Sequence, residues 1–175
     1  MLDVGCGGGL LTRQFASVAE AVVGVDPDEA SISVARAETT ASNVSYVLGD
    51  VGTHPFAPES FDVVASVAAI HHMDATEALE RFAELTRPGG HVGVIGIGRP
   101  DLPRDLPRAA LSSGATWWYR LVAGKTLWNH SAPIVWPPPT TEREMRAISA
   151  EVLPGSIFRR RLQGRYSIIW RKPSS

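Results

Sequence analysis

Several scarcities in this sequence narrow the kind of protein that it encodes. Its single cysteine, Cys6, excludes an internal disulfide framework and a multi-cysteine zinc site. No stretch approaches the roughly 18 uninterrupted apolar residues of a membrane span, and no basic leader precedes Asp3. Lysine is also rare, since 15 of the 17 basic residues are arginines. We therefore expect a soluble cytoplasmic protein without a membrane anchor or a metal site.

The composition is that of one folded domain. The chain has 175 residues, 44% of them hydrophobic and 20% charged, with a mean hydropathy of −0.01. Domains typically contain ~100–150 residues, so we expect a single domain with at most one elaboration. Residues 1–98 carry 4 basic and 13 acidic residues, whereas residues 99–175 carry 13 and 5. Electrostatic attraction between the acidic and the basic half is a simpler interpretation of this charge division than an acidic partner for the basic half.

Short apolar runs alternate with helical patterns as far as residue 98. The runs are rich in Val, Ile and Leu, as is typical of parallel strands that are covered on both faces. This alternation predicts an α/β fold with a Rossmann-like, doubly wound and mostly parallel sheet. The expected strands are Leu2–Gly5, Ala21–Val25, Val44–Leu48, Phe61–Val67 and His91–Ile97, and the expected helices are Leu10–Ala19, Asp28–Thr40 and Ala75–Arg87.

The pattern changes after residue 98. Residues 99–139 hold seven prolines and four of the five tryptophans without a clear period, which favours a functional insertion over a plain connector. The tryptophans suit a cap over an apolar acceptor or, equally, a small core that holds an irregular loop together. Residues 140–175 predict a helix from a capping box of Thr141 and Glu144 to about Glu151, and then a C-terminal antiparallel β-hairpin of Ile157–Leu162 and Tyr166–Arg171.

The start of the chain carries the strongest chemical signal. Residues 3–9 read DVGCGGG, a D-x-G-x-G-x-G pattern between an expected strand and an expected helix. Glycines are needed where the chain turns tightly and a ligand approaches the backbone. Leu10 stands where the dinucleotide fingerprint has its third glycine, and Asp3 suits a ligand that presents a cation rather than a pyrophosphate. Both residues therefore disfavour an NAD(P)-dependent oxidoreductase, which remains an alternative.

Two further acids follow later strands. Asp26 can accept hydrogen bonds from both hydroxyls of a ribose. Its alternative is an N-cap role, with Pro27 at the first helical position and Glu29 closing a capping box. Asp50 can accept from an adenine amino group while the Val51 amide serves a ring nitrogen, although an acid at this place can also be a simple turn residue.

Taken in order, these motifs resemble those of the class I S-adenosylmethionine (SAM)-dependent methyltransferases, in particular their small-molecule branch. The resemblance is carried by residues 2–9, 23–26, 49–50, 61–64 and 85–90. It implies SAM as the cofactor and a cofactor site of eleven residues: Asp3, Gly5, Cys6, Gly7 and Gly9 at the methionine end, Asp26 and Pro27 at the ribose, Asp50 and Val51 at the adenine, and Ser66 and Val67 near the sulfonium.

The family usually has a helical segment before its first strand, whereas this sequence begins inside that strand. We therefore expect a form without the N-terminal helix, whose pocket is open to solvent on one side and binds SAM weakly. A non-catalytic or truncated SAM-binding domain is accordingly a second alternative to an active enzyme.

Methyl transfer depends mainly on alignment of the acceptor, because the sulfonium already activates the carbon. A general base helps when the acceptor is a hydroxyl. The candidates are His71 and His72 after the fourth strand and His130 in the insertion, with packing as the alternative role. The family's Asn-Pro-Pro-aromatic signature for certain amino acceptors is absent, which favours O- or C-methylation of a small molecule. A nucleic-acid substrate is not expected, because no recognisable binding motif accompanies the Arg-rich half.

Overall fold

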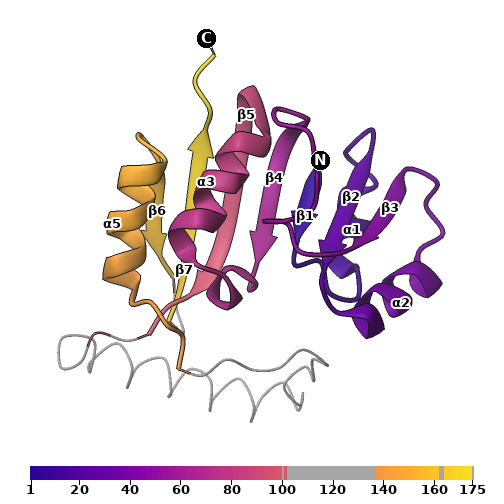
Figure 1. The fold of residues 1–175 in the computed structure, drawn as a ribbon, viewed down its shortest axis with the longest axis horizontal. Helices are drawn as coiled ribbons and strands as arrows, with labels where there is room; N and C mark the ends of the chain where they lie inside the picture. The colour runs from indigo at the N-terminus through magenta and orange to yellow at the C-terminus, as the bar shows by residue number, and fades with distance from the viewer. Residues whose placement is uncertain (100, 102–136, 162–163, 175) are drawn as a thin grey trace.

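A computed structural model of the chain describes residues 1–99, 101, 137–161 and 164–174. The strands in these residues are β1 (Leu2–Val4), β2 (Val22–Asp26), β3 (Val44–Leu48), β4 (Phe61–Val67), β5 (Thr86–Ile97), β6 (Ile157–Arg160) and β7 (Arg165–Arg171). They form one sheet in the order β3-β2-β1-β4-β5-β7-β6 (Figure 1). Pairing is parallel from β3 to β5, whereas β7 runs antiparallel to both β5 and β6. The predicted α/β sheet with a C-terminal hairpin is confirmed.

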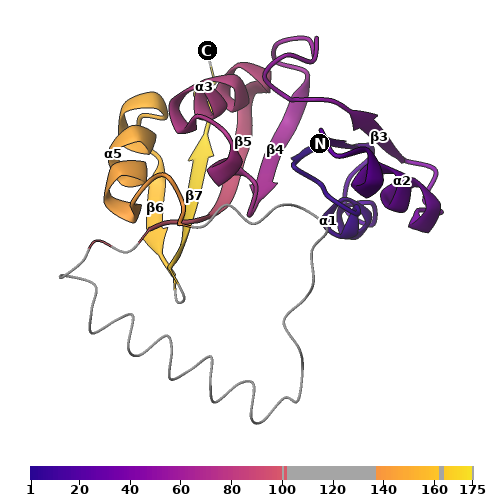
Figure 2. The same ribbon diagram turned by 60° about the horizontal axis from the view of Figure 1, so that its bottom comes forward.

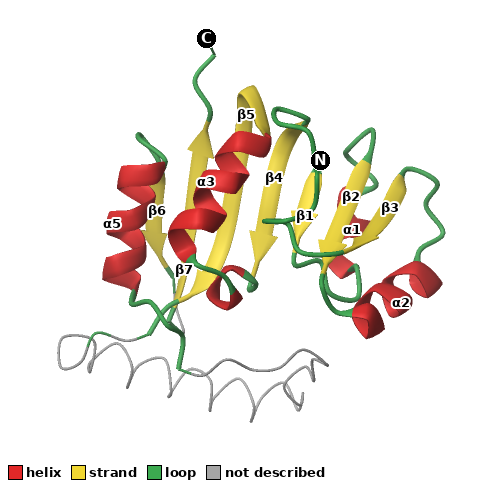
Figure 3. Cartoon of the chain, viewed as in Figure 1, coloured by secondary structure: helices red, strands yellow, loops and turns green. Residues whose placement is uncertain are grey.

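Helices cover the sheet in two groups. The described helices are α1 (Leu10–Phe15), α2 (Glu29–Glu38), the 3-10 turn η1 (Ile70–His72), α3 (Ala75–Leu85) and α5 (Glu142–Val152). Helices α1 and α2 pack on β2 and β3, whereas α3 and α5 contact each other over β4, β5 and β7 (Figures 1 and 2). Right-handed crossovers place helices on opposite faces where the strand order reverses, and Figure 3 shows this doubly wound arrangement. The reversal lies between β1 and β4.

The core is built where α3 meets the sheet. Its buried side chains, which include Leu79, Phe82 and Leu85, pack with Val64 and Val92 from the strands beneath. The Asp74 carboxylate caps this helix by accepting from the N–H groups of Thr76 and Glu77. The cap fixes where the helix begins, and its apolar face lies against the sheet.

The ends of the helices differ from the sequence prediction. Helix α3 ends at Leu85 rather than Arg87, because Thr86 is already extended and pairs with Phe61. Helix α1 ends at Phe15, four residues earlier than expected. The capping box of Thr141 and Glu144 on α5 is present as predicted.

The start of α2 corrects one alternative. The side chain that caps this helix is Asp28, which accepts from the Ser31 N–H, and the first helical residue is Glu29. The proposed N-cap role of Asp26, with Pro27 at the first helical position, is therefore wrong. Within the described part of the chain, no helix is long and apolar enough to cross a membrane.

Candidate active site

The carboxyl ends of β1 and β4 lie side by side where the strand order reverses. Val4 pairs with Ser66, so the loop after each strand begins at the same edge of the sheet. A Cβ on Gly5 would overlap the Cβ of Ala69, which shows that the two loops are in contact. Crevices outside such switch points are where open α/β sheets bind their ligands.

The glycine loop is tightly packed at Gly5 and Gly9 and open at Gly7. Gly5, Gly7 and Gly9 all have positive φ values, which only glycine adopts without strain. A Cβ added to Gly7 would meet nothing within 4 Å, whereas one on Gly9 would overlap the Tyr46 hydroxyl. Tyr46 of β3 therefore packs against the loop at Gly9, whereas the space beside Gly7 is open.

Asp3 is a buried carboxylate at the base of this loop. It is 1% exposed, and its Oδ2 accepts a hydrogen bond of 2.6 Å from the Thr12 hydroxyl. Burial raises the pKa of Asp3 to about 6, although the Thr12 hydrogen bond opposes this shift. A buried acid that is costly to ionise gains from a cationic ligand beside it.

Asp26 ties the glycine loop to the start of α2. Its Oδ2 accepts from the Gly7 N–H at 2.9 Å, and its Oδ1 accepts from the Asp28 N–H at 2.9 Å. The intervening Pro27 is exposed at the same edge of the sheet. Each carboxylate oxygen has a second lone pair, so the side chain keeps the capacity to accept from a ribose.

Cys6 packs inside the loop. Its N–H donates to the Val25 carbonyl at 3.2 Å, and burial raises the pKa of its thiol to about 12. The side chain stays protonated at neutral pH, so it is not a nucleophile.

Asp50 and Val51 open the loop that follows β3. The Asp50 carboxylate is exposed, and its Oδ1 accepts from the Gly52 N–H at 2.7 Å. Val51 is 4% exposed, and its side chain belongs to the core. Within the described part of the chain, the Val51 N–H makes no hydrogen bond.

The end of β4 and the η1 turn after it hold two polar atoms without partners. The Ser66 hydroxyl and the Nδ1 of His71 are both buried, although His71 as a whole is only half-buried, and neither atom makes a hydrogen bond among the described residues. Burial, followed by the neighbouring His72, lowers the pKa of His71, so this imidazole is neutral at pH 7. The two rings lie 4.2 Å apart, with His72 exposed. His130 lies outside the described residues.

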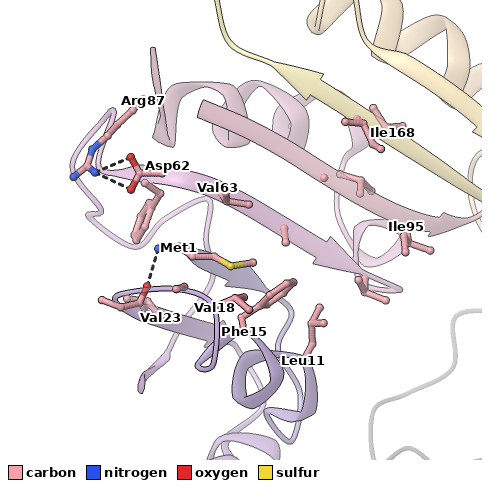
Figure 4. A pocket seen from close by; sticks show the side chains of 18 of the residues that line it. Met1, Leu11, Phe15, Val18, Val23, Asp62, Val63, Arg87, Ile95 and Ile168 are labelled. Carbon is pink, nitrogen blue, oxygen red and sulfur yellow. Dashed lines mark hydrogen bonds and ion pairs between the residues drawn. The ribbon is translucent and has the colours of Figure 1, made fainter. Parts of the chain in front are cut away.

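A separate groove follows the face of β4 and β5 beside α1 (Figure 4). Its volume is about 880 Å³, and Val67 is the one residue of the predicted site that lines it. One end carries the ion pair of Arg87 with Asp62, and Leu11 and Ile95 lie toward the other. The groove is thus distinct from the edge where the glycine loop and the acids converge.

Comparison with known proteins decides the family. The methyltransferase domain family matches residues 2–94 of the chain. The chain belongs to this family. It is 38% identical over 174 residues to an uncharacterized methyltransferase of Mycobacterium tuberculosis, which covers 99% of this chain and 87% of that protein.

Two other matches extend the comparison. A ubiquinone biosynthesis O-methyltransferase of Rhizobium etli is 37% identical over 102 residues, covering 57% of this chain and 41% of that protein. The solved SAM-dependent methyltransferase of Aquifex aeolicus superposes with a TM-score of 0.66 at 14% identity, over 97% of this chain and 80% of that one. The sequence-based resemblance to class I methyltransferases is confirmed, and the oxidoreductase alternative is wrong.

The structure adds supporting residues that the sequence did not point to. Thr12 bonds to Asp3, Tyr46 lies under Gly9, and Arg81 of α3 holds the loop after β3. An aromatic residue inside a strand or an arginine on a helix carries no local signal of such a role. The described residues contain no cluster of His, Cys, Asp and Glu that could hold a metal ion.

Proposed function

We propose that this methyltransferase moves the methyl group of SAM to an oxygen or carbon atom of a small molecule. The observation that carries the proposal is the row of acids and glycines at neighbouring strand ends. Asp3 lies in β1, Asp26 ends β2 and Asp50 comes shortly after β3, and the glycine loop lies between the first two along the chain. These residues lie along the carboxyl-terminal edge of the sheet, which suits an extended nucleoside with a charged tail.

The residues present fit SAM as the expected cofactor. Asp3 and the loop of Gly5, Cys6, Gly7 and Gly9 would face the methionine end, where open space lies before Gly7. Asp26 and Pro27 would hold the ribose, Asp50 and Val51 the adenine, and Ser66 and Val67 the region of the sulfonium. SAM supplies a methyl carbon that is activated by a positively charged sulfur.

The acceptor side of the site is supplied by the turn after β4. The unpaired Nδ1 of neutral His71 is suited to take the proton of an acceptor hydroxyl as that oxygen attacks. The O-methyltransferase matched over 102 residues supports an oxygen acceptor. The prediction that residues 99–139 form an acceptor cap falls almost wholly outside the described residues and stays a proposal.

Methyl transfer can be measured directly with SAM labelled in its methyl group and a panel of phenols, enols and carboxylates. We expect label in at least one acceptor and one S-adenosylhomocysteine for each product. His71→Ala should slow transfer to a hydroxyl by about 10²–10⁴-fold without changing the affinity for SAM. His91→Ala, an exposed histidine on β5, is the control. SAM binding without transfer to any acceptor would favour the non-catalytic alternative.

A further inference from the structure

Arg81 holds the loop after β3 with an unusual concentration of hydrogen bonds. From α3, its guanidinium donates to three carbonyls: Val51 at 3.2 Å, His54 at 2.9 Å and Phe56 at 3.2 Å. Its remaining terminal nitrogen bonds to the Glu84 carboxylate at 2.6 Å. The side chain is 16% exposed, so these bonds are shielded from water more than an ordinary surface arginine's would be.

These bonds fix the backbone of the loop that holds Asp50 and Val51, the residues proposed to bind adenine. Three carbonyls of one short loop converge on a single cation, which offsets their mutual repulsion and sets the loop's path. The same loop begins with Asp50, whose backbone carbonyl accepts from the His54 N–H at 2.8 Å. A shift of the His54 backbone would therefore move Asp50 as well.

The opposite side of the loop is held by packing. The Val51 side chain lies in the core, and the rings of Phe56 and Phe61 meet edge to face at 5.6 Å. The Val51 N–H is left without a partner in the described residues, and the Asp50 carboxylate is exposed beside it. Packing fixes how closely the loop approaches the core, whereas the hydrogen bonds of Arg81 fix the orientation of the loop's peptide groups.

We infer that Arg81 is a positioning residue that sets the selectivity of this site for adenine, through the Val51 and Asp50 backbone. The inference rests on the proposed function, because it requires SAM or its product to bind here. Arg81 itself contacts no ligand in this account. Its effect is confined to the end of the cofactor that carries the 6-amino group.

The test compares two ligands that differ at this group. S-adenosylhomocysteine has a 6-amino donor for Asp50, whereas S-inosylhomocysteine has an oxygen there. We expect wild-type protein to prefer the first by at least tenfold in calorimetry. Arg81→Ala should weaken binding of S-adenosylhomocysteine about tenfold and leave S-inosylhomocysteine nearly unchanged, so that the preference disappears. Arg81→Lys, which keeps the charge and is less disruptive to folding, should give an intermediate preference.

Arg87→Lys is the matched control, since Arg87 also holds a loop by bonding to the Glu59 carbonyl and to Asp62. It should leave both affinities as in the wild type. Equal weakening of both ligands in the Arg81 variants, or an unchanged preference, would overturn the inference while leaving the proposed function intact. Failure of the wild type to bind either ligand would overturn the proposed function and the inference with it.

Discussion

At the scale of single residues, the candidate site contains a buried acid, Asp3, whose ionisation is unfavourable for folding. Asp3 is buried beneath the glycine loop with Thr12 as its hydrogen-bond donor. Its pKa is raised from 3.8 to about 6 because burial penalises the charged form. The folded chain thus binds more protons than the unfolded chain between these values, and this residue's contribution to stability is lost as the pH rises through them. An acid that costs stability at neutral pH is consistent with a role toward a cation.

Asp3→Asn should therefore raise stability and lower affinity at the same pH. The free energy of unfolding at pH 7 should increase by about 2–3 kcal/mol, because the cost of a buried charge is removed. The fall in stability of the wild type between pH 4 and pH 6 should flatten. Urea unfolding across this range and calorimetry with SAM would measure both effects. Higher stability with unchanged SAM affinity would show that Asp3 does not face the cofactor.

At the scale of elements, the site is a contact between two loops. The glycine loop and the turn after β4 meet at Gly5 and Ala69, next to the Val4–Ser66 pair of the ladder. The loop therefore has little room to move relative to the turn that carries His71. Under the proposed function, this packing would align the cofactor with the acceptor.

Gly5→Ala should destabilise the fold by about 1–3 kcal/mol through overpacking and by about 1–2 kcal/mol through the left-handed backbone. Adding Ala69→Gly should recover the overpacking share, giving a coupling of about 1–3 kcal/mol in a double-mutant cycle. Gly7→Ala, where a Cβ meets nothing within 4 Å, should show strain without coupling to Ala69. Additive effects of the Gly5 and Ala69 changes in urea unfolding would mean that the loops are not in contact.

The order of elements could be predicted from the sequence because each signal is local. Apolar runs mark the strands, and positive φ at Gly5, Gly7 and Gly9 explains the glycine motif. The cap at Asp28 was missed because two acids flank Pro27 and local rules do not choose between them. The supports of the site were missed because their partners lie far away in the chain, as the 30-residue separation of Arg81 from Val51 shows.

At the scale of the whole molecule, an antiparallel ladder joins residues 1–98 to the C-terminal part of the chain. Seven residue pairs link β5 to β7, so the C-terminal hairpin extends the sheet of the N-terminal half. Lys172 adds an ion pair with Glu59 at 3.0 Å, one link between the basic and acidic halves. The hydrogen bond from the Arg99 N–H to the Thr140 carbonyl brings together the two ends of the intervening segment. The edge with the glycine loop and the C-terminal part thus belong to one continuous sheet.

The most direct test of the proposed SAM site is a calorimetric titration of SAM into the wild type, Asp26→Asn and Asp26→Ala. We predict one site in the wild type and a loss of about 1.5–3 kcal/mol of binding free energy in Asp26→Ala, because a charged acceptor for the ribose is removed. Asp26→Asn, which retains one acceptor oxygen, should lose less. Equal SAM affinity in all three proteins, with only the thermal stability lowered, would contradict the account by reducing Asp26 to a tether between Gly7 and Asp28.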